Sequence, residues 1–372
     1  MKVGILTFHF AHNYGAMLQA YGLSKYINSL GHKCEIVDYR LRYIYQWVEK
    51  YSLFSYYHAQ REDGFGFIRS VLRTVRYYPR LKQSKDNRWE LFDKFMNTYL
   101  PIGHRIYKKS KIGAKYDALV VGSDQIWNAD LTDGLQDVYF LNFDFDGKRI
   151  AYAASSGQDF VAGDLDYINK TFKKFDYISC RESGLSSYCA NLLNRDIPTV
   201  CDPIFLLSKD DWTTLCTNRI FNEEYILVYG FNENSLFGDV IKKVSTLLNL
   251  PVIRIGNRDL PQLNTETYKI EAGPIEFLTL FNNSSYIITN TFHGVSTAMV
   301  FNKQFVAVLP DCRFNRIVNV LRIAKLNDRI VNNIDDIKSI IDSEIDYDKV
   351  ESNMSGLIEA SKKYIQESLK NG

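Results

Sequence analysis

The residues best suited to chemistry lie in one short turn, residues 290–294, between two apolar segments. Tyr286–Thr289 before it is rich in β-branched residues and predicts a buried strand, and 295–302 after it predicts a short helix. His293 in this turn can donate or accept a proton near neutral pH. Helix N-termini carry free N–H groups that suit an anion. The turn therefore predicts acid–base chemistry on an anionic substrate.

A purely structural explanation of the same turn stays open. Thr291 could cap the helix, Gly294 could relieve crowding, and His293 could be a buried side chain with its hydrogen bonds satisfied. Other polar residues follow predicted strands and are weighed in the same way. Arg181 follows Tyr177–Cys180 and offers a bidentate fork for a carboxylate or phosphate, or a surface salt bridge.

Two further stretches place polar groups at strand ends. Asp124 and Trp127 follow the strand predicted over 116–121. Asp124 could act as a base or cap a turn, and Trp127 could stack on a sugar or fill the core. Arg313 and Arg316 follow the strand predicted over 304–309, so either could lie beside the His293 turn in a parallel sheet.

Strands and helices alternate from the N-terminus and restart after about residue 205, which predicts an α/β protein with two Rossmann-like, doubly wound domains facing across a cleft. We expect domains at 1–204 and 205–348, with a helix at 349–372 packing back. The first β-α-β unit lacks the GxGxxG pattern of dinucleotide sites, so no nucleotide cofactor is predicted.

Residues 40–115 form an insertion rich in aromatic and basic residues, with 14 Lys/Arg and 5 Asp/Glu between 61 and 115. The spacing of Arg69, Arg73, Arg76 and Arg80 places them on one helix face beside an apolar stripe. Ser84 is expected to cap a separate helix that runs to Tyr99. A basic amphipathic helix can lie on an anionic membrane, but an ordinary solvated face over a core stripe would have the same pattern.

Composition narrows the class of protein. A net charge of +2 requires no acidic partner, and we expect no nucleic-acid binding. The 6 cysteines form no CxxC pair, which indicates reduced thiols in a cytoplasmic protein, neither a metal site nor a disulfide framework. No stretch reaches the roughly 18 apolar residues of a membrane span.

Several separated segments together resemble the polysaccharide pyruvyl transferase family. They are similar to its motifs in the same order along nearly the whole chain. The matching segments are ILTFHFAHNYGAMLQAYGL at the N-terminus, Gly122-Ser123-Asp124-Gln125-Ile126-Trp127-Asn128, Ser179-Cys180-Arg181-Glu182-Ser183, Cys201-Asp202-Pro203, Ile287–Val308 and Asn315-Arg316-Ile317. Gln304 replaces a proline of the family, and Thr291-Phe292-His293 stands where better-characterised members carry R-L-H.

The resemblance implies a GT-B-like arrangement and transfer of pyruvate from phosphoenolpyruvate to a sugar, giving a cyclic ketal and phosphate without metal or cofactor. The acceptor would be a sugar repeat unit of a surface polysaccharide or exopolysaccharide, attached to a lipid at the inner face of the membrane. Catalysis is expected from His293 and Asp124. Donor binding is expected from Arg181, Thr291, Gly294, Arg313 and Arg316, and acceptor binding from His9, Asn13, Tyr14 and Trp127.

Two alternatives of different classes stay open on the sequence. One is a nucleotide-sugar-dependent glycosyltransferase of GT-B architecture, whose donor would also present phosphate to a helix N-terminus. The other is a catalytically idle sugar-binding protein, because a fold does not fix a function.

Overall fold

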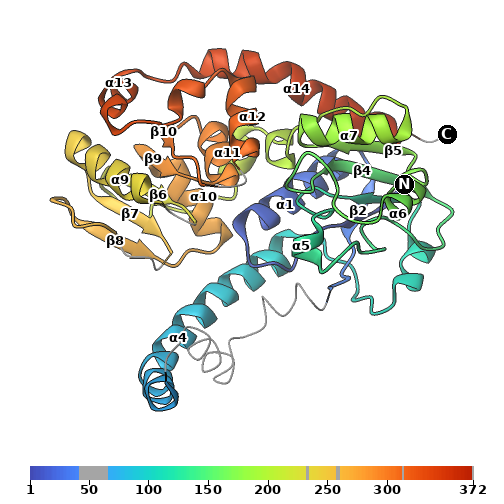
Figure 1. Ribbon diagram of the computed structural model, residues 1–372, viewed down its shortest axis with the longest axis horizontal. Coiled ribbons are helices and arrows are strands. Elements are labelled where there is room, and N and C mark those ends of the chain that lie inside the picture. Colours follow the sequence, from blue (N-terminus) through green and yellow to red (C-terminus); the bar gives the residue numbers. More distant parts are fainter. Residues whose placement is uncertain (42–65, 232–233, 257–259, 312–313, 371–372) are drawn as a thin grey trace.

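The computed structural model describes residues 1–41, 66–231, 234–256, 260–311 and 314–370. Its core is two parallel five-stranded sheets, each flanked by helices (Figure 1). The turns in which the sequence predicts catalytic or binding residues follow the carboxyl ends of strands in both sheets. The predicted α/β class is confirmed.

The first sheet has the strand order β2-β1-β3-β4-β5, and every pair is parallel. Apolar runs form these strands because both faces of the sheet are covered by helices. The register aligns Val3 of β1 with Cys34 on one side and with Ala118 on the other. The strands are β1 (Lys2–Leu6), β2 (Lys33–Ile36), β3 (Ala118–Val121), β4 (Lys148–Ala154) and β5 (Tyr177–Cys180).

The second sheet has the order β10-β9-β6-β7-β8, again with every pair parallel. Strand β9 pairs with β10 and β6, and all four of its residues are buried. The strands are β6 (Ile226–Tyr229), β7 (Val252–Ile255), β8 (Thr267–Ile270), β9 (Tyr286–Thr289) and β10 (Gln304–Ala307).

Helices cover both faces of each sheet (Figure 1). The α-helices are α1 (Tyr14–Ser29), α4 (Phe67–Tyr99), α5 (Ala129–Thr132), α6 (Leu165–Phe172), α7 (Ser183–Leu193), α8 (Lys209–Thr213), α9 (Ser235–Leu248), α10 (Pro274–Asn283), α11 (Phe292–Val300), α12 (Asn315–Ala324), α13 (Ile337–Asp342) and α14 (Tyr347–Ser368). Short 3-10 helices are η1 (Lys109–Lys111), η2 (Gly113–Lys115), η3 (Pro203–Leu206), η4 (Asn327–Arg329) and η5 (Ile334–Asp336).

Two sequence predictions of elements are wrong. The separate helices expected around the basic face and after Ser84 are one continuous helix, α4, which runs through Pro79. The apolar residues of the segment 199–202 also predict a strand, but this segment makes only an isolated bridge between Thr199 and Cys180 before η3 begins.

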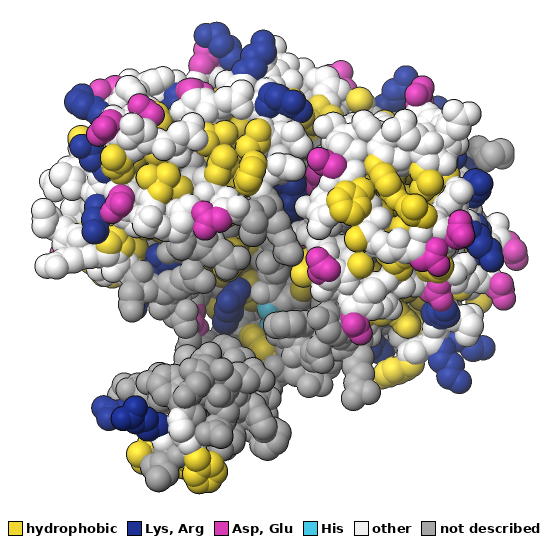
Figure 2. All heavy atoms as spheres, in the orientation of Figure 1, with side chains coloured by type: hydrophobic (Ala, Val, Ile, Leu, Met, Phe, Trp, Pro, Cys, Tyr) yellow, Lys and Arg dark blue, Asp and Glu magenta, His cyan; other side chains and the backbone are white. Residues whose placement is uncertain are grey.

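Helix α4 projects away from the two domains at its N-terminal end (Figure 1). The apolar stripe expected to pack inward is exposed at the positions that are described: Val71 is 39%, Leu72 64% and Val75 69% exposed. Arg69 and Arg76 are exposed on the same helix, whereas the side chains of Arg73 and Arg80 lie outside the described residues. In Figure 2 the outer end of this arm carries both basic and hydrophobic side chains.

Helix α14 runs across both domains (Figure 1). In its first half, Asn353 Nδ2 donates to Ala324 O at 3.1 Å, which ties it to the end of α12. In its second half, the Ser361 hydroxyl accepts from Cys201 N at 2.8 Å, and Tyr364 OH donates to Ala151 O at 2.9 Å. One helix therefore fixes the second domain to the edge of the first sheet.

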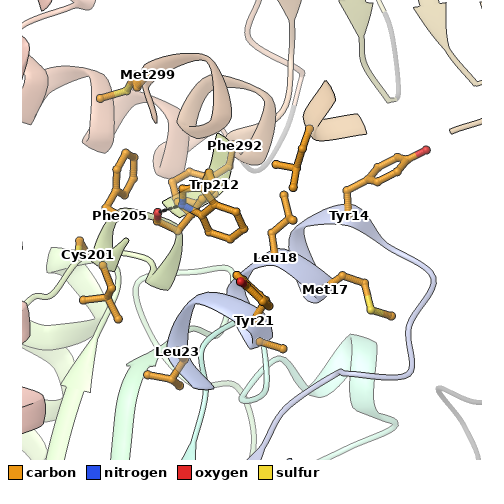
Figure 3. Close-up of a cluster of buried hydrophobic side chains, with 14 of the residues drawn as sticks. Tyr14, Met17, Leu18, Tyr21, Leu23, Cys201, Phe205, Trp212, Phe292 and Met299 are labelled. Atoms are coloured by element: carbon orange, nitrogen blue, oxygen red, sulfur yellow. Dashed lines mark hydrogen bonds between the residues drawn. The ribbon is translucent and has the colours of Figure 1, made fainter. Parts of the chain in front are cut away.

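A shared hydrophobic core also joins the domains. Figure 3 shows side chains of α1 beside Phe205 and Trp212 of the connecting segment and Phe292 of α11. Trp212 is fully buried and donates from Nε1 to Ile204 O at 3.0 Å. This core holds the two sheets together.

Candidate active site

The turn after β9 is built around a helix cap. Thr291 accepts a hydrogen bond from Gly294 N at 2.9 Å, so α11 begins at Phe292, three residues earlier than predicted, and His293 lies in its first turn. A Cβ on Gly294 would lie 2.0 Å from Thr289 Oγ1, which explains the glycine. The capping explanation of Thr291 and Gly294 therefore holds. The Thr291 hydroxyl and the Gly294 N–H are bonded to each other, and the expected contact of these residues with a donor stays a prediction.

His293 is not satisfied in the same way. Its Nε2 lies 3.6 Å from Asp202 Oδ2, which is within ion-pair range but too long for a hydrogen bond, and it has no other partner among the described residues. On the other side, Gly15 of α1 packs directly against the ring: a Cβ at this position would lie 2.0 Å from Nδ1. The imidazole of the second domain is thus held between two parts of the first domain, with Nδ1 beside Gly15 and Nε2 facing the Asp202 carboxylate.

Arg181 and two carboxylates form a buried network beside His293. Arg181 donates from Nη1 to Asp202 Oδ2 at 2.7 Å and from Nε to Glu182 Oε1 at 3.2 Å. All three side chains are at most 4% exposed. Burial by itself would raise the pKa of Asp202, but His293 and Arg181 outweigh it and hold the pKa well below the usual range. Burial would lower the pKa of Arg181, but Glu182 and Asp202 raise it.

Besides His293 Nε2, three atoms of the Arg181 network and of the neighbouring α12 are buried without a hydrogen-bond partner in the described part of the chain. They are Arg181 Nη2, Glu182 Oε2 and Arg316 Nε. Unpaired polar atoms in a protein interior cost free energy, so they mark positions where a ligand can supply the missing partner.

Arg316 supplies a second cation from α12. Phe292 lies between the two arginines, with its ring centre 5.0 Å from Arg181 Cζ and 5.8 Å from Arg316 Cζ. Burial and the nearby Arg181 lower the pKa of Arg316 to about 10, so it remains charged at neutral pH. The other expected arginine, Arg313, lies outside the described residues.

Asp124, the second expected catalytic residue, is partly exposed at the end of β3. It accepts a hydrogen bond from Gln125 N at 2.8 Å, as the capping alternative predicts. It is also close enough to raise the pKa values of Arg181 and Arg316. The Asp124 carboxylate therefore lies near Arg181 and Arg316, and the residue is partly exposed to solvent.

The residues expected to bind the acceptor have structural roles instead. Trp127 is 1% exposed in the core, where its Nε1 donates to Tyr139 O. Tyr14 is 3% exposed; its hydroxyl donates to Ala272 O of the second domain at 2.6 Å. Asn13 is the N-cap of α1 and accepts from Ala16 N at 3.2 Å.

His9 is fully buried, with Nδ1 3.2 Å from Thr7 O and Nε2 3.1 Å from Asp38 Oδ1. Arg40 Nε also donates to Asp38, at 2.7 Å. Burial would raise the pKa of Asp38, but the hydrogen bonds from His9 and Arg40 lower it to about 2. This cluster anchors the loop after β1, and the expected contact of His9 with an acceptor stays a prediction.

The chain is similar to one known protein family. The family model described as polysaccharide pyruvyl transferase matches residues 13–311, which include both strand-end turns, Arg181, Asp202 and His293. The chain belongs to the polysaccharide pyruvyl transferase family. The resemblance read from the sequence is thereby confirmed, and so is a transferase assignment. A comparison with curated proteins gives no match.

Solved structures share the fold of this family member at low sequence identity. A protein from Listeria monocytogenes, named for UDP-N-acetylglucosamine 2-epimerase activity, has a TM-score of 0.50 and 10% identity over 98% of this chain and 94% of its own. The UDP-GlcNAc 2-epimerase of Neisseria meningitidis bound to UDP-GlcNAc has a TM-score of 0.49 and 10% identity, and covers 100% of each chain. The S. aureus MnaA-UDP structure has a TM-score of 0.49 and 11% identity over 95% of this chain and 90% of its own. These similarities concern the two-domain GT-B-like fold alone.

The candidate site contains residues that were not predicted from the sequence. Glu182 and Asp202 stand inside recognised motifs, and each follows an apolar segment, which is the signal that could have identified them. Gly15 and Phe292 gave no such signal, because their importance comes from contacts between the domains. Within the described residues, no group of three or more His, Cys, Asp or Glu side chains could hold a metal ion.

Proposed function

We propose that this family member transfers pyruvate from phosphoenolpyruvate to two hydroxyls of one sugar, forming a cyclic ketal and releasing phosphate. The observation that carries the proposal is the combination of His293, whose Nε2 lies 3.6 Å from Asp202 Oδ2, with the unpaired N–H groups of Arg181 and Arg316. This arrangement combines a candidate general acid with positively charged N–H groups that can bind a carboxylate and a phosphate.

Charge supports an anionic donor. Arg181 is paired with Glu182 and Asp202, whereas Arg316 Nε has no hydrogen-bond partner among the described residues, so Arg316 is the cation with an N–H group left for an anionic ligand. The donor carboxylate or phosphate would bind Arg316 and the remaining N–H of Arg181. Because Thr291 stands in place of the family arginine, binding of the donor anion would depend on Arg316 of α12.

The reaction moves two protons. In this proposal His293 donates one proton to the methylene carbon of the enol, which becomes the methyl group, while a sugar hydroxyl adds to the neighbouring carbon. The second hydroxyl then displaces phosphate and its proton leaves with that group. Asp202 would stabilise the imidazolium form of His293. Asp124, whose charge acts on Arg181, would accept the proton of the first hydroxyl, and that proton would then return to His293.

The test combines a donor panel with a variant. Thermal protection by phosphoenolpyruvate, compared with a panel of nucleotide sugars, identifies the donor. Turnover is followed by phosphate release with a diol-bearing sugar acceptor. His293→Gln should lower turnover by roughly 10²–10⁴-fold, the share of a general acid, and preserve protection by phosphoenolpyruvate. His104→Gln, at an exposed position, is the matched control. Protection by nucleotide sugars alone, or full turnover in folded His293→Gln, would contradict the proposal.

We also propose that the acceptor is a lipid-linked sugar unit and that the α4 arm brings the enzyme to an anionic membrane face. Between 67 and 85 the arm carries six Lys/Arg and no Asp/Glu. Its described apolar residues are exposed beside them, which favours the membrane explanation over a buried stripe. Each basic residue near such a surface contributes about 1 kcal/mol. No described helix has the length and apolar content needed to cross a membrane.

Vesicle co-sedimentation tests the arm. Wild type should bind anionic vesicles at low salt and be released as salt rises. Reversal of Arg69 and Arg76 to glutamate should weaken binding, whereas reversal of Lys338 and Lys363, exposed basic residues of the second domain, should not. Equal binding by both reversed proteins would refute a specific role for the arm.

A further inference from the structure

A row of aromatic rings crosses the junction between the two domains, and we call it the aromatic wall. Each ring contacts the next, with centres 5.1–5.6 Å apart. In order from the base of α4 to the loop after β6, the members are Trp89, His12, Phe92, Tyr14, Tyr229 and Phe231. Tyr14 stands next to Gly15, which packs against the His293 ring, so the aromatic wall passes beside the candidate active site.

The middle and the ends of the aromatic wall differ in exposure. Phe92 is fully buried, and Tyr14 and Tyr229 are each 3% exposed, as expected of a contact that holds two domains together. At the ends, Phe231 is 43% exposed and Trp89 is half-buried. Docking of the domains does not require exposed rings at both ends, so these two rings are available to a ligand that lies along the aromatic wall.

A hydrogen-bond donor lies among the rings at the Trp89 end. The Arg88 guanidinium lies over Tyr14 and Phe92, with Cζ 5.4 and 5.2 Å from the ring centres. Its Nη2 donates to His12 O at 3.3 Å. Arg88 Nε is buried and has no hydrogen-bond partner among the residues that the structure describes. An unpaired buried N–H costs free energy, and a ligand with an acceptor would remove that cost.

His12 provides a complementary acceptor. Its Nε2 lies 3.3 Å from Asp93 Oδ1. Burial lowers the pKa of His12, so the ring is neutral at pH 7 and carries one N–H, which donates to Asp93. His12 Nδ1 is then an acceptor, and it too has no partner in the described part of the chain. The Asp93 side chain is 53% exposed and offers further acceptor oxygens.

A ligand for this surface must present apolar faces to the rings, with both hydrogen-bond donors and acceptors at its edges. Sugar rings have this combination, because their C–H groups form apolar faces and their hydroxyls donate and accept. We propose that the aromatic wall binds the acceptor as an oligosaccharide, with sugar units beyond the one that receives pyruvate lying against Trp89 and Phe231. A lipid chain would leave Arg88 Nε and His12 Nδ1 unpaired, and a phosphate oxygen could not donate to His12 Nδ1.

The identity of this ligand as the acceptor rests on the proposed function, whereas binding of an oligosaccharide to the aromatic wall does not. Arg181 and Arg316, the cations proposed to hold the donor, are not members of the aromatic wall and do not contact its polar atoms in the described part of the chain. The donor and the oligosaccharide can therefore bind at the same time, on either side of His293.

Calorimetry with the full-length protein, in the absence of phosphoenolpyruvate, tests the binding. The probes are the mono-, di- and tetrasaccharides of glucose, galactose and N-acetylglucosamine. A tetrasaccharide of at least one of these sugars should bind about tenfold or more tightly than its monosaccharide, because it reaches an exposed ring of the aromatic wall.

Trp89→Ala and Phe231→Ala remove the exposed rings, one from each domain, so the result does not depend on the folding of a single variant. Each should lower the affinity for that tetrasaccharide by about tenfold and leave the affinity for the monosaccharide unchanged. In turnover assays each should raise KM for the tetrasaccharide without lowering kcat. Phe160→Ala is the matched control, because it removes a ring that is 48% exposed and lies outside the aromatic wall.

The proposal is overturned if no tetrasaccharide binds wild type more tightly than its monosaccharide, or if both variants bind the tetrasaccharide as wild type does. Thermal protection by phosphoenolpyruvate is measured on the same proteins and should persist in both variants. If the variants lose the tetrasaccharide but phosphoenolpyruvate protects none of the proteins, the aromatic wall stands as an oligosaccharide site and the proposed function fails instead.

Discussion

The contact between Gly15 and His293 gives a sharp prediction. Gly15 lies in the first turn of α1, and its added Cβ would stand 2.0 Å from His293 Nδ1, 2.2 Å from Cε1 and 2.5 Å from Cγ. Ordinary contacts between such atoms are about 3.5–4.0 Å. Gly15→Ala must therefore move the imidazole or α1 by more than about 1 Å. The backbone of α11 is fixed by its cap, so the ring is the part that moves.

The size of the effect follows from this displacement. Misplacing a catalytic group by about 1 Å can lower the rate roughly 10²-fold, and we expect this loss in Gly15→Ala if His293 is the proton donor. Overpacking costs about 1–3 kcal/mol, but alanine regains up to about 1 kcal/mol of helix propensity in α1. The expected net loss of stability is about 1–2 kcal/mol.

The assay is a double-mutant cycle that does not require turnover. Urea unfolding is measured for wild type, Gly15→Ala, His293→Ala and the double variant. Removal of the ring should abolish the penalty of Gly15→Ala, giving a coupling of about 1 kcal/mol or more. Gly238→Ala in α9 is the matched control, because its Cβ would meet no atom within 4 Å. If Gly15→Ala costs the same free energy with and without His293, the steric reasoning is wrong.

Three further predictions test separate parts of the structure. Arg316→Ala should weaken phosphoenolpyruvate binding by about 1.5–3 kcal/mol in calorimetry, and unchanged affinity would remove Arg316 from the donor site. Tyr14→Phe removes the donor to Ala272 O and should lower the free energy of unfolding in urea by about 1 kcal/mol, whereas no loss would mean that this bond contributes nothing. Asp38 has a pKa lowered from 3.8 to about 2, so the folded state gains stability above pH about 4 and loses it as pH falls through about 2. Asp38→Asn should cost about 2 kcal/mol at neutral pH and flatten that acid dependence in urea titrations, and an unchanged slope would contradict the His9 anchor.

The strands and most helices could be predicted because their signals are local. Buried parallel strands need continuous apolar residues, and Tyr286–Thr289 is such a run with every residue buried in β9. The start of α11 was predicted three residues late, because Thr291 was weighed both as a cap and as a ligand residue. Helix α4 was divided in two because proline and serine are ordinarily helix boundaries, although the structure continues through both.

The candidate site was predictable only in part, for a physical reason. His293, Arg181 and Arg316 stand next to strand ends or on a following helix, and parallel strands bring such positions to one edge. Their partners come from the other domain or from another element: Asp202 and Gly15 meet His293 across the junction. Sequence periodicity does not encode that docking. For the same reason, the sequence could not show that His9, Tyr14 and Trp127, which were predicted to bind the acceptor, are buried and have hydrogen-bond partners inside the protein.

The pairing of charges also determines which substitution can be interpreted. Arg181 is buried against Asp202 and Glu182, so Arg181→Ala would leave two carboxylates unpaired and cost about 3–5 kcal/mol of stability. A loss of donor binding in that variant could then come from unfolding. Arg316 forms no hydrogen-bonded ion pair in the described part of the chain, and it lies against the Phe292 ring. Its removal would therefore leave no carboxylate without an ion-pair partner. Arg316→Ala is therefore the substitution that tests donor binding without removing the ion-pair partner of a buried carboxylate.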